Sequence, residues 1–299
     1  MNPGLVSLDH CPACLSKTRT FLFKISQSGV FQCAECRLRY LDPCLSPEAM
    51  AAAYASDETL TAIRGSNARY YDYGDLDEPG KTRNDFMRGI ELAEAALPAG
   101  RPKRIFDIGY GSGFFLALAR SRGWVPDGID TSTKNLELSR KKFKLALRAG
   151  DFEREVPEDP VFDVVSLWDV IEHFSDPRAV LRKITRILVP GGLLLMAVPN
   201  DRSFLRYCGE LAYRLSGGLF RAGIETLYFL EHVSYFSRPT LRRMLDLHGF
   251  REVDYFYTST DLARYDFPWY KRVIAAAVLW AGRVFRMENR VVMLFRKEG

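Results

Sequence analysis

Residues 105–114 read IFDIGYGSGF, a short apolar segment followed by glycine at every second position. The apolar part, Arg104 to Ile108, predicts a buried strand, and Phe114 to Arg122 predicts a helix. A glycine-rich turn between a strand and a helix lets a ligand approach the backbone, because a Cβ atom would block that approach. The stretch therefore predicts a ligand-binding loop within an α/β fold.

The spacing of the glycines separates this loop from a dinucleotide loop. Dinucleotide sites use G-x-G-x-x-G, which would place the third glycine where this chain has Phe114. Here the third glycine is Gly113, and Asp107 stands at the end of the strand. A NAD-dependent oxidoreductase or epimerase is therefore the less favoured alternative.

Strand and helix patterns alternate from residue 81 to the end of the chain. Alternation of this kind is typical of a parallel sheet with crossover helices. We therefore expect an α/β fold with a Rossmann-like, seven-stranded sheet. The strands are expected at 104–108, 125–129, 145–148, 162–168, 193–198, 251–258 and 290–296.

Acidic residues follow the next two strands. Asp130 ends the second strand, where a carboxylate can accept both hydroxyls of a ribose. Asp151 and Phe152 follow the third, where they can accept from an adenine amino group and cover its ring. Because the carboxyl ends of parallel strands meet at one edge, these groups should converge on one crevice.

These features together resemble class I S-adenosylmethionine (SAM)-dependent methyltransferases. The resemblance covers residues 80–299 and includes two further segments, FDVVSLWDVIEH at 162–173 and RILVPGG at 186–192. It implies that Asp107 and the glycine loop hold the methionine part of the cofactor, Asp130 the ribose, and Asp151 with Phe152 the adenine. Tyr110 occupies a position that is usually small in that family. The implied cofactor-binding residues are Asp107, Gly109, Gly111, Gly113, Asp130, Asp151, Phe152 and Asp169.

Four of the six cysteines form two C-x-x-C pairs in the first 45 residues. The pairs are separated by the roughly 15–20 residues that are typical of a four-cysteine zinc site. Four thiolates would fill a tetrahedral Zn²⁺ shell, so the expected metal is structural and not catalytic. The predicted ligands are Cys11, Cys14, Cys33 and Cys36.

The expected organisation has three parts. Residues 1–45 form a zinc ribbon, residues 46–80 form a linker or lid, and residues 81–299 form the methyltransferase domain, with an insertion near 200–231. Basic residues in the ribbon lack the aromatic platform of a nucleic-acid site, so nucleic acid is not expected as a partner.

A glutamate and a histidine, Glu231 and His232, are the candidate catalytic residues. They follow the fifth strand and can overhang the crevice, where His232 could remove a proton from a hydroxyl or a carbon acid. The alternative is a structural histidine at a helix entrance. His173 is expected at the pocket floor.

The segment EHVSYFS at 231–237, combined with a four-cysteine ribbon, resembles deoxysugar C-methyltransferases and related enzymes of surface-polysaccharide pathways. In that family the corresponding histidine is the proposed base, which implies the role for His232. Phe229 stands where the family has an aromatic hydroxyl. The implied acceptor is a small molecule or a lipid- or nucleotide-linked compound such as a sugar.

The insertion at 203–229 and the apolar stretch near 269–285 are aromatic and flanked by arginines. They could lie on an anionic membrane and admit a lipid-linked acceptor, or they could form a lid packed on the domain.

Composition sets the remaining limits. The hydrophobic fraction is 47%, the charged fraction 26% and the formal net charge +5 with a pI near 8.8. These values are typical of a globular protein and suit an anionic acceptor. The chain starts without a visible secretory signal, so a cytoplasmic location is expected. The remaining alternative is a non-catalytic zinc-ribbon binding protein with a methyltransferase-like fold.

Overall fold

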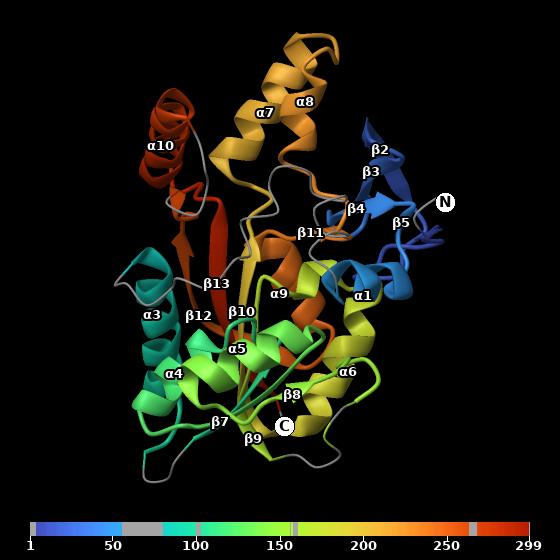
Figure 1. Ribbon diagram of the computed structural model, residues 1–299. Coiled ribbons are helices and arrows are strands. Elements are labelled where there is room, and N and C mark those ends of the chain that lie inside the picture. The colour runs from blue at the N-terminus through green and yellow to red at the C-terminus, as the bar shows by residue number, and fades with distance from the viewer. Residues whose placement is uncertain are drawn as a thin grey trace.

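The structure is a computed structural model that describes residues 4–55, 80–99, 103–155, 157, 161–262 and 268–298. Its centre is a seven-stranded sheet with the order β12-β13-β10-β9-β6-β7-β8 (Figure 1). The expected α/β fold with a Rossmann-like seven-stranded sheet is confirmed. The strands are β6 (Arg104–Ile108), β7 (Val125–Asp130), β8 (Arg148–Ala149), β9 (Phe162–Trp168), β10 (Leu188–Pro199), β12 (Phe250–Thr258) and β13 (Arg290–Lys297).

Strands β10, β9, β6, β7 and β8 are mutually parallel, and β13 is antiparallel to both β10 and β12. The carboxyl ends of the parallel strands therefore lie at one edge of the sheet. The fifth strand starts earlier than expected, because Leu188 already pairs with Phe162 before the register shifts at the Pro-Gly-Gly turn and resumes at Leu193.

Helices cover both faces of the sheet because successive strand residues point to opposite sides. Ile105 and Val164 pack with α3 (Lys81–Ala96), α4 (Phe114–Ser121) and α5 (Thr133–Phe143). Their neighbours Phe106 and Val165 pack with α6 (Pro177–Ile187) and α9 (Arg238–Asp246) on the other face. Asp176 caps α6 by accepting from the Ala179 N–H at 3.0 Å, as its Asp-Pro start predicts.

The cysteine-rich region forms a small antiparallel sheet of β2 (Arg19–Ile25), β3 (Ser28–Cys33) and β4 (Arg39–Asp42). Its fourth strand, β11 (Ser234–Tyr235), comes from far along the chain and pairs with β4. Strands β1 (Leu5–Val6) and β5 (Cys44–Leu45) pair beside it, and α1 (Pro47–Ala55) follows. The expected linker therefore begins with a helix, while residues 56–79, with Tyr70, Tyr71 and Tyr73, lie outside the described residues.

Four further helical segments lie at or beyond the carboxyl edge of the parallel strands. They are the 3-10 turn η3 (Ile171–His173), α7 (Phe204–Leu215), α8 (Arg221–Glu225) and α10 (Trp269–Val284). Helices α7, α8 and α10 project away from the sheet (Figure 1). Among the described helices, none is long and apolar enough to cross a membrane.

Candidate active site and cysteine cluster

A cavity of about 230 Å³ opens at the carboxyl edge of the sheet, next to the ends of β6, β7, β8 and β9. Six of the predicted cofactor residues line it and two do not. Those that line it are Gly109, Gly111, Asp130, Asp151, Phe152 and Asp169. The two that do not line it are Asp107 and Gly113.

At two positions of the glycine loop the absence of a side chain is required. Gly109 has φ +71°, and a Cβ there would meet Val170 Cγ2 at 2.7 Å. Gly111 has φ +56°, and its N–H donates to Asp130 Oδ2 at 2.8 Å. Non-glycine residues rarely adopt this left-handed conformation, so the loop stays open on its cavity side only with glycine.

Asp130 lines the cavity beside the glycine loop. Its Oδ1 accepts from the Ser132 N–H at 2.9 Å and from Asn135 Nδ2 at 3.1 Å, and its Oδ2 accepts from Gly111. Burial raises the pKa of Asp130, and two backbone N–H donors and the Asn135 amide oppose that shift. Since a carboxylate offers about four acceptor sites, one remains for a ligand.

Asp107 lies beneath the loop. The Ser166 hydroxyl donates to Asp107 Oδ1 at 2.7 Å. Burial raises the pKa of Asp107 to about 8, and the nearby charge of Asp130 adds to the rise. Tyr110 is buried, packs near Gly128 and does not line the cavity, so it leaves the cavity open.

Asp151 and Phe152 form the adjacent wall. Phe152 is buried, and its ring centroid lies 6.0 Å from that of Phe106. Asp151 accepts from the Glu153 N–H at 2.8 Å and remains partly exposed at the cavity. An apolar ring and an acceptor therefore stand side by side.

Asp169 has an unusual backbone. Its φ is +56°, although it carries a side chain. Arg290 of β13 holds its carboxylate with two bonds, from Nη2 at 2.6 Å and from Nε at 3.2 Å. A strained residue at a cavity is often functional. Arg290 was not predicted from the sequence, because nothing local links it to a residue 121 positions earlier.

The candidate catalytic residues His232 and Glu231 do not line the cavity. His173 lines it instead, and its ring centroid lies 4.7 Å from that of His232. His173 Nδ1 donates to the Glu231 carbonyl oxygen at 2.8 Å, and the Tyr54 hydroxyl lies 3.0 Å from Nδ1 and 3.2 Å from Nε2. A neutral His173 with its proton fixed on Nδ1 keeps Nε2 as the proton-accepting nitrogen.

Glu172 lies behind the two histidines and is fully buried. Burial raises its pKa well above the ordinary value, and the charge of Asp169 adds to the rise. Donor atoms of Glu172, His173 and His232 lie within 4.8 Å of one another.

Helix α1 forms the remaining wall of the cavity. Its position at the cavity was not predicted from the sequence. Pro47, Met50, Ala51 and Tyr54 line the cavity from the segment that directly follows the cysteine-rich sheet. Their spacing marks one face of a helix, but the sequence does not show what that face covers.

The four predicted cysteine ligands form a compact cluster. Their sulfur atoms all lie within 4.8 Å of one another, and two pairs, Cys11 with Cys36 and Cys14 with Cys33, lie 3.5 Å apart. A tetrahedral Zn²⁺ with Zn–S bonds of ~2.3 Å would hold sulfur atoms about 3.8 Å apart. The cluster therefore fits such an ion.

Comparison with known proteins assigns the family. The family model for the methyltransferase domain matches residues 82–255. Because that span is more than half of the chain and contains the glycine loop and most of the sheet, the chain belongs to the methyltransferase domain family. Its domain is that of a class I SAM-dependent methyltransferase.

Curated relatives match a shorter part. Ubiquinone biosynthesis O-methyltransferase from Bordetella bronchiseptica is 32% identical over 146 residues, which are 46% of this chain and 60% of the relative. The protein of the same name from Caulobacter sp. is 31% identical over 103 residues, 32% of this chain and 41% of the relative. The chain thus spans about half the length of the curated relatives it matches.

Solved structures share the fold. A chain from the complex of a Haloferax volcanii methyltransferase activator with a methyltransferase gives a TM-score of 0.52 at 18% identity, covering 79% of this chain and 98% of that one. The N-methyltransferase NodS from Bradyrhizobium japonicum, solved with S-adenosyl-L-homocysteine, gives 0.51 at 15% identity, covering 79% and 99%.

Proposed function

We propose that the protein transfers a methyl group from SAM to a small or lipid-linked acceptor. The observation that supports this function most directly is the convergence of the open glycine loop, Asp130 and the Asp151–Phe152 wall on one cavity at the carboxyl edge of the sheet. SAM supplies a methyl group on a sulfonium that a nucleophile can displace in line. The family match gives no support to the NAD-dependent alternative.

Each wall has a proposed task. The remaining acceptor site of Asp130 takes a ribose hydroxyl, and Phe152 covers the adenine while Asp151 accepts from its amino group. Gly109 and Gly111 let the methionine part approach the backbone, and Asp169 faces its ammonium group. Asp107 and Gly113 shape the loop from below, since neither lines the cavity.

Calorimetric titration with S-adenosylhomocysteine tests this assignment. We expect Asp130→Ala to weaken binding by about 10- to 100-fold, because hydrogen bonds to a charged group contribute roughly 1.5–3 kcal/mol. Asp127→Ala, three residues earlier on β7 and outside the cavity lining, is the matched control. Absence of binding to the unmodified protein would refute the cofactor. Binding without turnover of any acceptor would favour the non-catalytic alternative.

The proposed base belongs to a pair of histidines, His173 and His232. His232 and Glu231 are the candidates from the sequence, and the geometry adds His173, which lines the cavity and lies against His232. We propose that His173 Nε2 takes the proton of the acceptor and that His232 positions the His173 ring. The Glu231 carbonyl fixes the His173 tautomer through the bond from Nδ1.

Steady-state kinetics separate these roles. His173→Gln should lower kcat by about 10²- to 10⁴-fold, the range of general base catalysis, and leave the affinity for S-adenosylhomocysteine unchanged. His232→Gln should lower kcat less and shift the pH profile that His173 sets. His248→Gln, in the turn after α9 and outside the cavity lining, is the control. Unchanged turnover in both variants would exclude the pair.

Two acceptor chemistries fit this base. The relatives named as ubiquinone biosynthesis O-methyltransferases support a hydroxyl oxygen, and the EHVSYFS segment supports the carbon of a sugar. Either acceptor must lose a proton during transfer. Helices α7 and α10 favour an acceptor with a lipid part, since they leave the same edge of the sheet as the cavity.

We also propose that the cysteine cluster holds one structural Zn²⁺. The supporting observation is geometric: all four sulfur atoms lie within 4.8 Å of one another, close to the spacing of a tetrahedral Zn²⁺ shell. In this proposal residues 1–45 and the domain at 81–299 function as one unit. Strand β11 of the domain completes the cysteine-rich sheet, and α1, which follows that sheet, lines the cavity.

A further inference from the structure

Helix α7 turns two of its three charged side chains inward and several apolar side chains outward, while Arg214 is exposed. Arg206 and Glu210 point into the molecule, where their side chains are 7% and 14% exposed. Tyr207, Leu211 and Leu215, also four residues apart, are exposed, with Leu215 at 80%. A helix on a water-exposed surface normally shows the opposite arrangement.

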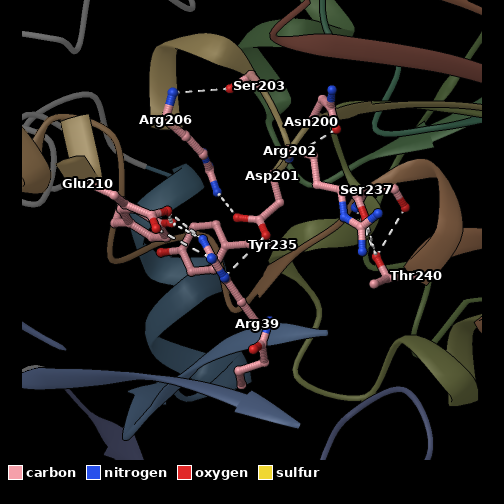
Figure 2. Close-up of polar contacts among 12 residues, drawn as sticks. Arg39, Asn200, Asp201, Arg202, Ser203, Arg206, Glu210, Tyr235, Ser237 and Thr240 are labelled. Atoms are coloured by element: carbon pink, nitrogen blue, oxygen red, sulfur yellow. Dashed lines mark hydrogen bonds and ion pairs between the residues drawn. The ribbon is translucent and has the colours of Figure 1, made fainter. Parts of the chain in front are cut away.

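Buried ion pairs fix that orientation. Arg206 Nη1 lies 2.8 Å from Asp201 Oδ1, and the Arg206 guanidinium lies over the ring of Tyr235 (Figure 2). Glu210 accepts from Arg39 of β4 and from the Tyr228 hydroxyl at 2.7 Å. Rolling α7 to hide its apolar face would carry Arg206 and Glu210 into water and leave their partners Asp201 and Arg39 buried and unpaired, which is strongly destabilising.

Helix α10 is also uncovered. Of its sixteen residues only Gly282 is buried, while Trp269 and Trp280 are 78% and 69% exposed. The helix contains no acidic residue between 269 and 284, and it carries Lys271 and Arg283 near its two ends.

The two helices contact each other where α7 begins and α10 ends. The Phe204 and Phe285 rings stack with centroids 5.6 Å apart, and the Phe204 N–H donates to the Met287 carbonyl oxygen at 2.8 Å. Leu219, in the turn after α7, extends the surface and is 89% exposed. We call this the α7–α10 surface, and its exposed apolar residues are Tyr207, Leu211, Leu215, Leu219, Phe220, Trp269, Tyr270, Val273, Ile274, Trp280, Val284 and Phe285.

We propose that the α7–α10 surface docks onto the interface of a bilayer that contains anionic lipids. Aromatic side chains at helix ends beside lysine and arginine are the composition that favours the headgroup region. A second copy of the chain fits less well, because a two-fold pairing of α10 would place its cations near one another with no acids opposite.

The α7–α10 surface and the cavity lie at the same edge of the central sheet. Helix α7 follows the carboxyl end of β10, and α10 connects β12 to β13 at the same edge, where the cavity opens. Docking there would bring the cavity near the headgroups, so a lipid-linked acceptor would need only to extend its head into it. The inference deepens the proposed function, but its readout, vesicle binding, does not depend on methyl transfer.

Co-sedimentation with vesicles tests the proposal. We expect the full chain to bind vesicles of equal parts phosphatidylcholine and phosphatidylglycerol more tightly than vesicles of phosphatidylcholine alone, with a difference that falls as salt is added. Leu215→Ser/Trp280→Ser should weaken partitioning by about tenfold or more, because each exchange removes apolar burial. Lys271→Glu/Arg283→Glu should remove the preference for anionic vesicles.

The control replaces two exposed apolar residues elsewhere, Leu247→Ser/Val253→Ser, and should bind vesicles like the unmodified protein. Binding of S-adenosylhomocysteine should be unchanged in every variant, which separates this proposal from the cofactor assignment. No sedimentation with anionic vesicles would overturn it. So would a dimer in light scattering that only the α7–α10 variants dissociate.

Discussion

Asp107 and Asp130 end neighbouring strands, and the structure gives them different hydrogen-bond environments. Burial raises the pKa of both carboxyl groups. Asp130 accepts three hydrogen bonds from N–H donors and keeps an acceptor site at the cavity, whereas Asp107 accepts from the Ser166 hydroxyl. The carboxylate that faces the cavity is thus the better stabilised of the two, which suits a residue that binds a neutral hydroxyl.

The raised pKa of Asp107 predicts a pH-dependent stability. A carboxyl group whose pKa is about 8 when folded and about 3.9 when unfolded favours the folded state most at low pH. Its contribution is lost as pH rises, by up to about 1.4 kcal/mol per pH unit until about pH 8. Asp107→Asn does not titrate, so its free energy of unfolding relative to the unmodified protein should increase between roughly pH 5 and pH 8.

Urea denaturation of the ligand-free proteins at several pH values measures this difference. The asparagine of the Asp107→Asn variant would still accept the Ser166 hydroxyl through its amide oxygen, so the local hydrogen bond survives the exchange. A difference that stays constant with pH would mean that Asp107 is ionised in the folded protein.

At the scale of elements, strand β11 links the cysteine-rich sheet to the candidate catalytic segment. Tyr40 pairs with Ser234, and the Leu41 N–H donates to the Val233 carbonyl oxygen at 2.9 Å. This pairing begins next to His232, so β4 and β11 connect the cysteine cluster to the histidine pair.

Cysteine replacement tests that link. Cys36→Ser removes one proposed Zn²⁺ ligand and should speed amide exchange at Leu41 and Tyr235 by about tenfold or more, because the β4–β11 pair loses the sheet that supports it. Removal of the metal from the unmodified protein with a chelator should do the same. Cys208→Ser, on α7 and outside the cluster, is the control. Loss of zinc without faster exchange would show that β11 is held independently of the metal.

Strand β11 also shows which elements the sequence can predict. Strands β6 and β9 are mostly apolar, and the Asp176-Pro177 start of α6 is a local signal, so all three were predicted near their observed positions. Two-residue strands have no periodicity: β8 is Arg148–Ala149, whereas the third strand was expected at 145–148, and the partner of β11 lies almost 200 residues away from it. For the same reason the sequence does not predict Arg290 as the partner of Asp169 or α1 as a cavity wall, because each depends on a contact between distant segments. The inverted face of α7 was visible as aromatic and basic residues, but its orientation depends on Arg39.

At the scale of the whole molecule, one apolar cluster spans both sheets. Cys11, Leu38 and Tyr40 of the cysteine-rich region belong to the same cluster as Phe106 of the central sheet and Leu241 of α9. Parts that share a core lose the same contacts when either unfolds, so they should unfold as one cooperative unit.

We therefore expect zinc release and loss of the far-ultraviolet circular dichroism signal to show the same urea midpoint. Release can be followed with a chromogenic chelator that binds only the freed ion. S-adenosylhomocysteine at about 100 times its Kd should raise the free energy of unfolding by about 2.7 kcal/mol if it binds only the folded state. Because α1 follows the cysteine-rich sheet and walls the proposed cofactor cavity, both midpoints should rise together. Zinc release at a lower urea concentration, unaffected by the ligand, would show instead that the two parts unfold separately.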